Sequence, residues 1–362
     1  MASRTFVPDC NGISGCRVTR GFLRRLPQTA LLAAVVACSG NGDSGATSKK
    51  TTTRTLTLGA YTTPREAYGR AILPAFAREW RRAEAESLRF ETSYQGSGAQ
   101  ARAIVAGFEA DVAALSLEPD LQTLEKAHLI TSDWRTGETG GIITRSIVVI
   151  AVRPGNPKHI SSWDDLRRPG VQVVMPNPKT SGGAMWNVMA MYGAALRGFT
   201  SAPKSDSAAA ERLVRDVVHN VAIMDKGARE AILTFESGVG DATITYENEV
   251  LVARQSGKKM DYVVPNGTIV IENPVAVVDA YADRHGNRKV ADAFIKFLTT
   301  DSAQAAFEKF GLRRAKGETS GLPPLPASAF TIRDLGGWKQ VVPTVFGPGG
   351  VFERATNSVT KP

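Results

Sequence analysis

The chain has 362 residues, of which 43% are hydrophobic and 22% charged, and its formal net charge is +9 at pH 7. This length suits two lobes of ordinary domain size, and the composition is typical of a folded, water-soluble protein. The sequence has no apolar run of about 18 residues or more, and its basic residues form no clustered stripe. It therefore predicts neither a membrane-spanning helix in the mature protein nor a nucleic-acid-binding surface.

The N-terminal region has the layout of an exported protein. A basic stretch over residues 17–25 precedes the short apolar run 31–37, and Cys38 follows at once. The apolar run is too short to span a bilayer, so residues 1–37 are predicted to be a secretory signal peptide. Residues 35–38 resemble a bacterial lipobox, which implies that Cys38 carries a lipid and anchors the mature protein to a membrane. An ordinary cleaved signal with an incidental cysteine stays open as the alternative.

Strand and helix patterns alternate after a Gly/Ser-rich tether. Period-two and continuous apolar runs predict strands at residues 55–61, 88–94, 111–117, 142–152, 171–175, 221–224 and 242–246. Helical patterns and capping residues predict helices at residues 64–83, 99–108, 184–196, 207–220, 227–237, 288–298 and 302–310. Pro74 predicts a kink or break within the first of these helices. Residues 260–278 are rich in strand-forming residues, and the segment beyond residue 321 is rich in Pro and Gly.

This alternation favours an α/β fold in which parallel sheets are covered by helices on both faces. The long apolar strand at residues 142–152 is expected to cross between two lobes, and the lobes would leave a cleft between them. The predicted parts are a tether (38–54), lobe 1 (55–143 plus 250–310), lobe 2 (144–249) and a C-terminal tail packed on the lobes (311–362).

Four junctions between a predicted strand and the following helix carry small or hydroxyl residues. They lie at residues 61–64, 95–98, 180–183 and 225–228. In parallel α/β sheets such junctions lie at the carboxyl ends of the strands, where ligands bind. A helix start exposes unpaired N–H groups and carries about half a unit of positive charge, so it binds anions. One such junction is more often an ordinary cap, but four in one chain favour a small anionic ligand.

At these junctions the sequence resembles a known family. Residues 177–184 (NPKTSGGA) are similar to the signature of periplasmic sulfate- and thiosulfate-binding proteins, and segments matching the family pattern follow the same order from residue 56 to at least 311. The resemblance implies a two-lobed periplasmic-binding-protein fold of type II, with sulfate in the cleft between the lobes. It also implies a monomer in the cell envelope that delivers its ligand to the membrane permease of an ABC transporter. No enzymatic activity, cofactor or metal is expected.

The resemblance also implies which groups hold the anion. The expected ligands are the backbone N–H groups of Thr62, Ser97, Gly182, Gly183 and Ala228, the hydroxyl of Ser181, and the side chain of Tyr246. Arg229 is expected behind the site, bonded to loop carbonyl groups.

Three positions depart from the family pattern. Thr62 stands for an Asp, which should matter little because the main chain is used, and Met185 stands for an Arg. Tyr246 stands for a Trp, and a phenol can donate or accept a hydrogen bond whereas an indole N–H only donates. Sulfate needs only donors, whereas hydrogen phosphate also needs an acceptor. Two readings stay open: Tyr246 simply donates to sulfate, or it adapts the site to another oxyanion such as phosphate or molybdate.

Other classes of function receive less support. Ser97 and Ser181 lie in no G-x-S-x-G elbow. The four histidines are interpreted as surface residues without acid partners, and the Glu247/Glu249 pair as exposed charge at a strand end. Trp163, Trp186 and Trp338 are interpreted as core residues. Cys10 and Cys16 lie in the predicted signal peptide, so no disulfide or thiol nucleophile is expected. A secreted hydrolase and a periplasmic sensor partner remain the rival hypotheses.

Overall fold

The computed structural model describes residues 53–359, so the predicted signal peptide, Cys38 and most of the tether lie outside the described residues. The strands are β1 (Thr53–Tyr61), β2 (Ser87–Gln95), β3 (Val112–Ala114), β4 (Ile142–Val152), β5 (Val173–Pro176), β6 (Val221–Asp225), β7 (Ala242–Tyr246), β8 (Asp261–Val263), β9 (Val270–Val277) and β10 (Arg313–Arg314).

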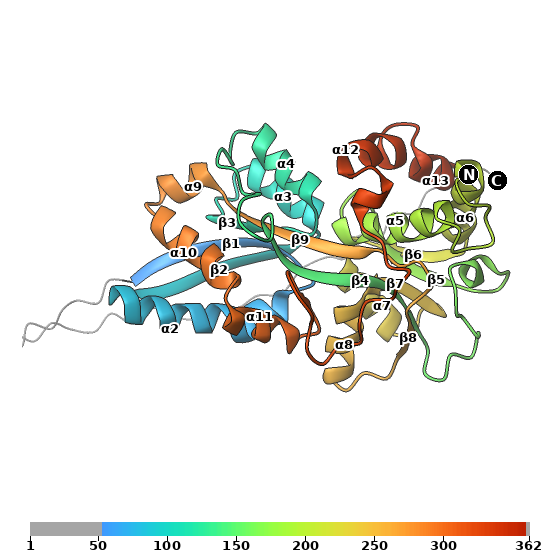
Figure 1. Ribbon diagram of the computed structural model, residues 1–362, viewed down its shortest axis with the longest axis horizontal. Coiled ribbons are helices and arrows are strands. Elements are labelled where there is room, and N and C mark those ends of the chain that lie inside the picture. Colours follow the sequence, from blue (N-terminus) through green and yellow to red (C-terminus); the bar gives the residue numbers. More distant parts are fainter. Residues whose placement is uncertain (1–52, 360–362) are drawn as a thin grey trace, which may run out of the picture. The chain divides into compact units, whose positions relative to one another are not determined.

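Helices connect most of these strands (Figure 1). The α-helices are α1 (Arg65–Ala67), α2 (Leu73–Glu84), α3 (Ser97–Val105), α4 (Glu118–Lys126), α5 (Gly182–Leu196), α6 (Ser207–His219), α7 (Ala228–Glu236), α8 (Glu247–Gln255), α9 (Asp279–Arg284), α10 (Arg288–Leu298), α11 (Asp301–Glu308), α12 (Trp338–Val341) and α13 (Val351–Val359). Short 3₁₀ or π turns are η1 (Tyr68–Ile72), η2 (Asp164–Arg167), η3 (Ile332–Leu335) and η4 (Val342–Phe346).

The strands are hydrogen-bonded in the order β2-β1-β3-β9-β4-β7-β5-β6, with β8 and β10 paired to β4. Strands on each flank are parallel, whereas β9 and β4 in the middle are antiparallel to their neighbours. The first half of β4 pairs with β9 and its second half pairs with β7. The long apolar strand therefore crosses from one lobe to the other, as its sequence predicted.

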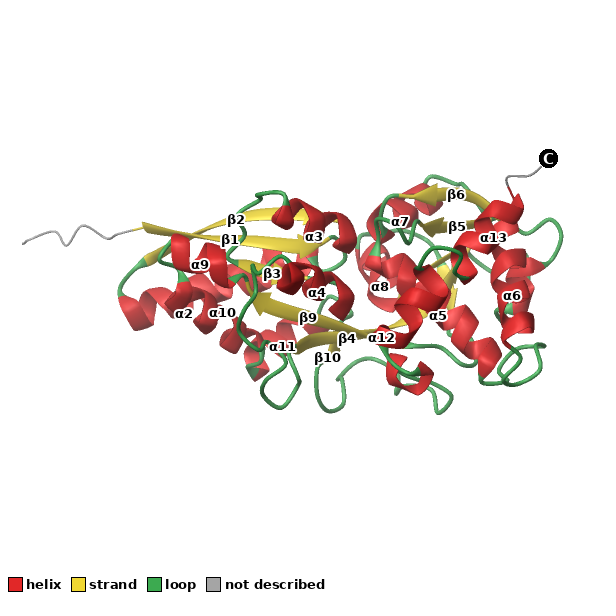
Figure 2. Cartoon of the chain, turned by 90° about the horizontal axis from the view of Figure 1, so that it is seen from above, coloured by secondary structure: helices red, strands yellow, loops and turns green. Residues whose placement is uncertain are grey.

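Each lobe buries helices against both faces of its sheet. In the first lobe α2, α10 and α11 pack on one face, and α3, α4 and α9 pack on the other (Figures 1 and 2). In the second lobe α5 and α6 lie on one face, and α7 and α8 lie on the other. The predicted tryptophan core positions are confirmed, because Trp163, Trp186 and Trp338 are all buried. This two-lobed α/β architecture agrees with the fold expected from the sequence.

The segment around Pro74 shows how the proline is accommodated. The π turn η1 precedes α2, and Pro74 occupies the first turn of α2. A residue in the first turn has no acceptor for its N–H within the helix, so proline is tolerated there. The helical segment changes from π to α geometry just before Pro74 and continues to Glu84.

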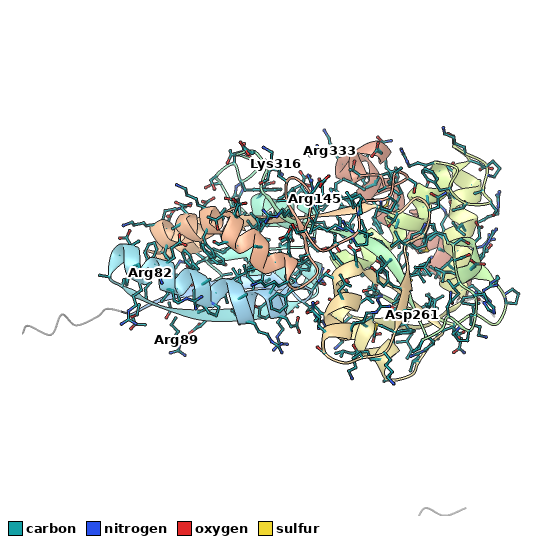
Figure 3. All side chains as sticks on the ribbon, turned by 60° about the horizontal axis from the view of Figure 1, so that its bottom comes forward. Arg82, Arg89, Arg145, Asp261, Lys316 and Arg333 are labelled. Atoms are coloured by element: carbon teal, nitrogen blue, oxygen red, sulfur yellow. The ribbon has the colours of Figure 1, made fainter. Side chains whose placement is uncertain are left out.

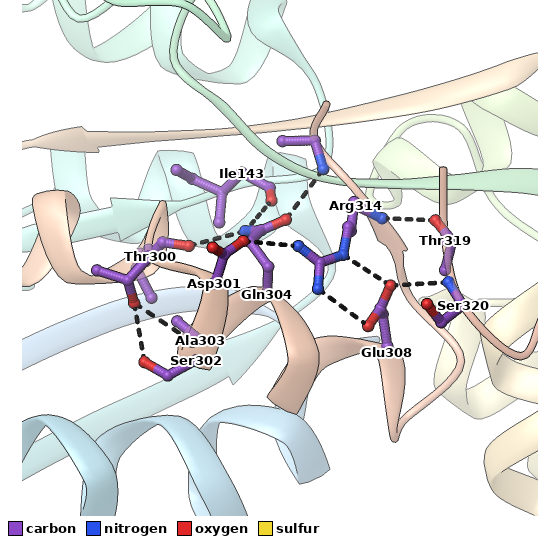
Figure 4. Close-up of polar contacts among 12 residues, drawn as sticks. Ile143, Thr300, Asp301, Ser302, Ala303, Gln304, Glu308, Arg314, Thr319 and Ser320 are labelled. Atoms are coloured by element: carbon purple, nitrogen blue, oxygen red, sulfur yellow. Dashed lines mark hydrogen bonds and ion pairs between the residues drawn. The ribbon is translucent and has the colours of Figure 1, made fainter. Parts of the chain in front are cut away.

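The C-terminal segment forms short helices that its Pro- and Gly-rich sequence did not predict. Phe330 pairs with Ile269 through an isolated bridge and joins the core of the second lobe, and α13 packs on α6. The start of this segment is held by Arg314, which bonds Glu308 (2.8 Å) and Asp301 (3.0 Å) of α11 (Figure 4). Apolar burial and these ion pairs order the segment.

The division of the chain between the lobes stays a prediction. Helix α8 contacts β4 and β7, and β8 pairs with the second half of β4. A return to the first lobe at β9 therefore fits the packing better than a return at residue 250.

Among residues 53–359, no helix combines the length and apolarity that crossing a bilayer requires. Figure 3 labels charged side chains from several elements: Arg82 on α2 lies at one end of the view, and Arg145 on β4 and Arg333 on η3 lie near its middle.

Candidate anion-binding site

Three of the four predicted junctions meet at Gly96. A Cβ atom at Gly96 would lie 2.5 Å from the carbonyl oxygen of Thr180 and 3.1 Å from that of Lys226. The N–H of Ala99 donates to the Thr180 carbonyl (3.3 Å), and the Thr180 hydroxyl donates to the Lys226 carbonyl (2.7 Å). The loop before α3 therefore contacts the loops before α5 and α7, across the two lobes, and only glycine fits at this crossing.

Gly183 lies at the centre of a second set of contacts. A Cβ atom at Gly183 would lie 2.8 Å from the ring of Tyr246, 3.2 Å from Cβ of Ala228 and 3.4 Å from Oγ of Ser181. A Cβ atom at neighbouring Gly182 would lie 2.8 Å from Oγ of Ser116. The structure thus brings most of the expected ligand residues together around the first turn of α5.

Main-chain N–H groups at this point are not used by hydrogen bonds within their helices. Helices α3, α5 and α7 begin at Ser97, Gly182 and Ala228, so the N–H groups of their first turns have no acceptor within the helix. Ser181 caps α5 by accepting from the N–H of Ala184 (3.3 Å). Its hydroxyl proton is not used by that bond and remains available for a ligand.

Thr62 is placed less directly. It is buried immediately after β1. The ring of its neighbour Tyr61 lies 6.3 Å from the ring of Tyr246, centroid to centroid. Thr62 is therefore near the same region. Its other neighbour, Thr63, accepts a long contact (3.5 Å) through its carbonyl from Arg229, the residue after Ala228.

The Ser97 side chain is hydrogen-bonded to a buried carboxyl group. Its hydroxyl donates to Asp120 of α4 and accepts from the N–H of Ser116 (2.8 Å). Burial raises the pKa of Asp120 to about 6, against the hydrogen bond from Ser97, which lowers it. The side chain of Ser97 is thus occupied within the protein, which leaves its main-chain N–H as the group that can face an anion.

Tyr246 bonds to a residue that the sequence did not single out. Its hydroxyl lies 2.6 Å from Oγ of Ser116, and both side chains are buried. Burial raises the pKa of the Tyr246 phenol well above its usual value, so the group keeps its proton. The signal that could have revealed Ser116 is a lone hydroxyl in an otherwise apolar strand segment, residues 112–117.

Arg229 has different partners from those expected. Its guanidinium donates to Glu66 of α1 (2.8 and 3.1 Å), and its Nε lies 2.9 Å from Glu249 of α8. Its contact with the Thr63 carbonyl is long at 3.5 Å. Two carboxylates therefore hold Arg229, and the bond to Glu66 joins the two lobes. Burial raises the pKa of Glu249 to about 7, although the neighbouring Arg229 acts to lower it.

Two further interpretations were wrong. Glu247 and Glu249 are buried rather than exposed, because helix α8 begins at Glu247 and turns both side chains inward. Glu247 pairs with Arg313 (2.8 Å). His285 was expected to lack acid partners, yet its ring nitrogens lie 2.8 Å from Asp111 and 2.9 Å from Glu109, and these carboxylates raise its pKa.

Met185 lies at the rim of the site. It helps to line a hollow of about 580 Å³ next to the start of α5, together with Gly98, Asp120 and Gly182. Basic side chains, Arg102 and Lys179 among them, also line this hollow. Within residues 53–359 no group of three or more His, Cys, Asp or Glu side chains is arranged to hold a metal ion.

Helix starts from two lobes, crossing strands between them and buried hydroxyls at their meeting point are typical of a two-lobed ligand-binding protein. The sequence matches the family described as bacterial extracellular solute-binding protein over residues 56–313. The chain belongs to this family.

Curated relatives cover most of the chain. The sulfate-binding protein of Synechococcus elongatus is 42% identical over 94% of this chain and 97% of its own length. The sulfate-binding protein of Escherichia coli is 37% identical over 77% of this chain and 86% of its own length. The thiosulfate-binding protein of Pseudomonas aeruginosa is 32% identical over 92% of this chain and 98% of its own length.

Among solved structures, the sulfate-binding protein SubI from Mycobacterium tuberculosis superimposes with a TM-score of 0.73 at 37% identity, covering 81% of this chain and 99% of SubI. A periplasmic thiamin binding protein shares the fold with a TM-score of 0.59 at 15% identity, covering 85% of this chain and 96% of that protein.

Proposed function

We propose that this chain is the extracytoplasmic solute-binding protein of an ABC importer and that it binds sulfate or a related tetrahedral oxyanion such as thiosulfate. The observation that carries the proposal is the meeting of the α3, α5 and α7 starts around Gly96 and Gly183. Family membership and the names of its sulfate- and thiosulfate-binding relatives support the same ligand class.

The anion would be held by uncharged donors. The proposed ligands are the main-chain N–H groups of Thr62, Ser97, Gly182, Gly183 and Ala228 and the hydroxyls of Ser181 and Tyr246. The helix dipoles stabilise the negative charge of an anion bound at these N–H groups, so no salt bridge is needed. No basic side chain is needed in contact with the ligand, since Arg229 is already held by two carboxylates.

Binding would close the two lobes. Contacts between them include Ser116 with Tyr246, Glu66 with Arg229, and the loop at Gly96 with Thr180. An anion that bridges helix starts from both lobes stabilises this closed form relative to an open one. The closed form would then dock on a membrane permease.

We further propose that the mature protein acts outside the cytoplasm as a monomer, anchored through lipid on Cys38. The supporting observations are the apolar run and small residues before Cys38 and the extracellular solute-binding family. Metabolic labelling with a radioactive fatty acid tests the anchor, with Cys38→Ser as the variant that should lose the label.

The chain would bind without turning its ligand over. The Ser97 hydroxyl donates to Asp120, and Ser181 caps α5, so neither hydroxyl is paired with a histidine base. Incubation with acyl and phosphate esters should release no product, whereas turnover would favour a hydrolase.

Isothermal titration calorimetry with sulfate, thiosulfate, molybdate and phosphate tests the proposed ligand class. We expect one tight site per chain for a sulfur oxyanion. A protein that binds neither sulfate nor thiosulfate would contradict the proposed function.

A further inference from the structure

A pair of buried hydroxyl groups lies inside the candidate site and is not explained by a site made only of donors. Ser116 follows β3 in the first lobe and Tyr246 ends β7 in the second, and their oxygens are 2.6 Å apart. Ser116 is 1% exposed and Tyr246 is fully buried at 0%, so water does not provide alternative partners.

The main chain of Ser116 is held from three directions. Its N–H donates to Ser97 Oγ (2.8 Å), and its carbonyl accepts from Trp186 Nε1 and from Asn273 Nδ2, both at 3.0 Å. These bonds come from α3, α5 and β9. The Ser116 hydroxyl is therefore held in place beside Tyr246, next to the first peptide of α5 at Gly182.

Counting protons shows what the pair can do. Each hydroxyl carries one proton and can also accept, and one of the two protons lies in the bond between them. The Asn273 side chain also bonds the Tyr246 hydroxyl. When Tyr246 donates to Ser116, the remaining lone pair on the Tyr246 oxygen can accept a ligand proton, and the Ser116 proton can point to a ligand oxygen. When Ser116 donates to Tyr246, the Tyr246 proton is the one that faces the ligand. The phenol stays protonated in either case, because burial raises its pKa.

We propose that Ser116 is a specificity-determining residue: by accepting the Tyr246 proton, it lets Tyr246 accept a hydrogen bond from a singly protonated tetrahedral oxyanion such as hydrogen phosphate. The inference rests on the proposed function, because it assumes that the anion lies at Gly183 and Tyr246. If the groups around Tyr246 could only donate, the proton of such a ligand would have no acceptor. A buried polar group without a partner lowers the binding affinity. The hydroxyl pair removes that cost and leaves sulfate binding possible.

The test compares three ligands on the protein and on its variants by calorimetry at about pH 8, where phosphate is mainly the singly protonated dianion. The ligands are sulfate, hydrogen phosphate and fluorophosphate, which keeps the phosphorus centre and the double charge but has no proton. We expect Ser116→Ala to weaken hydrogen phosphate at least about tenfold more than sulfate or fluorophosphate. The matched control is Ser237→Ala, because the Ser237 hydroxyl is exposed and bonds only the Thr234 carbonyl (2.7 Å).

A second variant keeps the inference testable if Ser116→Ala melts below the assay temperature. Tyr246→Trp replaces the phenol by a group that only donates, so it should lower the ratio of phosphate to sulfate affinity in the same direction. The inference is overturned if neither variant changes that ratio, or if the unmodified protein rejects hydrogen phosphate as strongly as Tyr246→Trp does. If the unmodified protein binds no sulfur oxyanion at all, the proposed function fails and the inference fails with it. Sulfate binding with an unchanged ratio defeats the inference alone.

Discussion

At the start of α5, Gly183 leaves no room for a side chain. An added methyl group would lie 2.8 Å from the Tyr246 ring and 3.2 Å from Cβ of Ala228. Because such close approaches force neighbours apart, the N–H groups of α5 and α7 would no longer face the same point. The absence of a side chain here is therefore a requirement of the proposed site and not only of the fold.

Gly183→Ala is expected to weaken sulfate binding by at least about tenfold and to lower the free energy of unfolding by roughly 1–3 kcal/mol. Calorimetry and urea denaturation measure the two effects. Gly69→Ala is the matched control, because an added Cβ at Gly69 has no neighbour within 4 Å. Equal sulfate affinity in the two variants would show that α5 does not contact the anion.

The protonation of Glu249 is expected to make the free energy of unfolding depend on pH. Its pKa is about 7 in the folded protein and about 4.3 in an unfolded chain. The native state therefore binds the proton more tightly, so the stabilisation is complete below about pH 4.3 and is lost as pH rises through about 7. Glu249→Gln should make the fall in unfolding free energy between pH 5 and 8 shallower, but not flat, because Asp120 titrates in the same range with a pKa of about 6.

Urea denaturation across this pH range tests the prediction. Glu138→Gln is the control, because the Glu138 side chain is 80% exposed and pairs only with Lys316 on the surface. A pH profile of Glu249→Gln that matches the unmodified protein would mean that Glu249 is ionised throughout.

Among single residues, the sequence predicted those whose role depends on local structure. The small residues at helix starts, such as Gly183 and Ala228, could be found because the strand–loop–helix pattern is local. Ser116 and Glu66 could not, because their partners Tyr246 and Arg229 lie 130 and 163 residues away. Only tertiary packing brings such pairs together, and it also buries Glu249, which the local pattern placed at the surface.

At the level of elements, the start of α5 combines a structural cap with a proposed ligand group. Ser181 accepts from the N–H of Ala184, and its own proton is free for the anion. Capping and binding therefore use different parts of one hydroxyl.

Ser181→Ala should lower the free energy of unfolding by about 1 kcal/mol and should also weaken sulfate binding several-fold. Thr300→Ala is the matched control, since Thr300 caps α11 in the same way, accepting from the N–H of Ala303. It should show a similar loss of stability without a change in affinity. The result that would contradict this account is a Ser181 variant that loses stability but keeps full sulfate affinity.

Most helices and strands with clear periodicity were predicted, and β4, β7 and α10 match the predicted residues. The missed elements have different physical causes. Helix α8 follows Tyr246 directly, so no turn separates it from β7, and α4 contains Pro119 in its first turn. Helix α13 forms where an amphipathic segment packs on α6 after a Pro- and Gly-rich stretch.

At the level of the whole molecule, binding and closure are coupled through contacts between the lobes. The pair between Arg229 of α7 and Glu66 of α1 is about one-fifth exposed on each side, at 21% and 23%. A partly exposed ion pair of this kind contributes about 1 kcal/mol or less. It therefore shifts the equilibrium between the open and closed forms only modestly.

Glu66→Gln should weaken sulfate binding by up to about fivefold, mainly through faster dissociation, because the closed form loses one contact. Stopped-flow measurement of sulfate release checks the rate. Glu84→Gln serves as the control, because Glu84 pairs with Lys289 within one lobe. Unchanged release from the Glu66 variant would mean that this ion pair does not favour closure.

The overall architecture followed from the sequence because alternating strands and helices leave few possible topologies. The position of the C-terminal segment did not, because it depends on apolar contacts such as that of Phe330 with the core of the second lobe.

The proposed anion site can be tested by a crystal structure with selenate, which replaces sulfate by an anion with an anomalous scatterer. We expect one anomalous peak between the starts of α3, α5 and α7, with oxygens within about 3.2 Å of the N–H groups of Ser97, Gly183 and Ala228. A crystal that binds selenate elsewhere, or that holds it through lysine and arginine side chains, would contradict the proposed site.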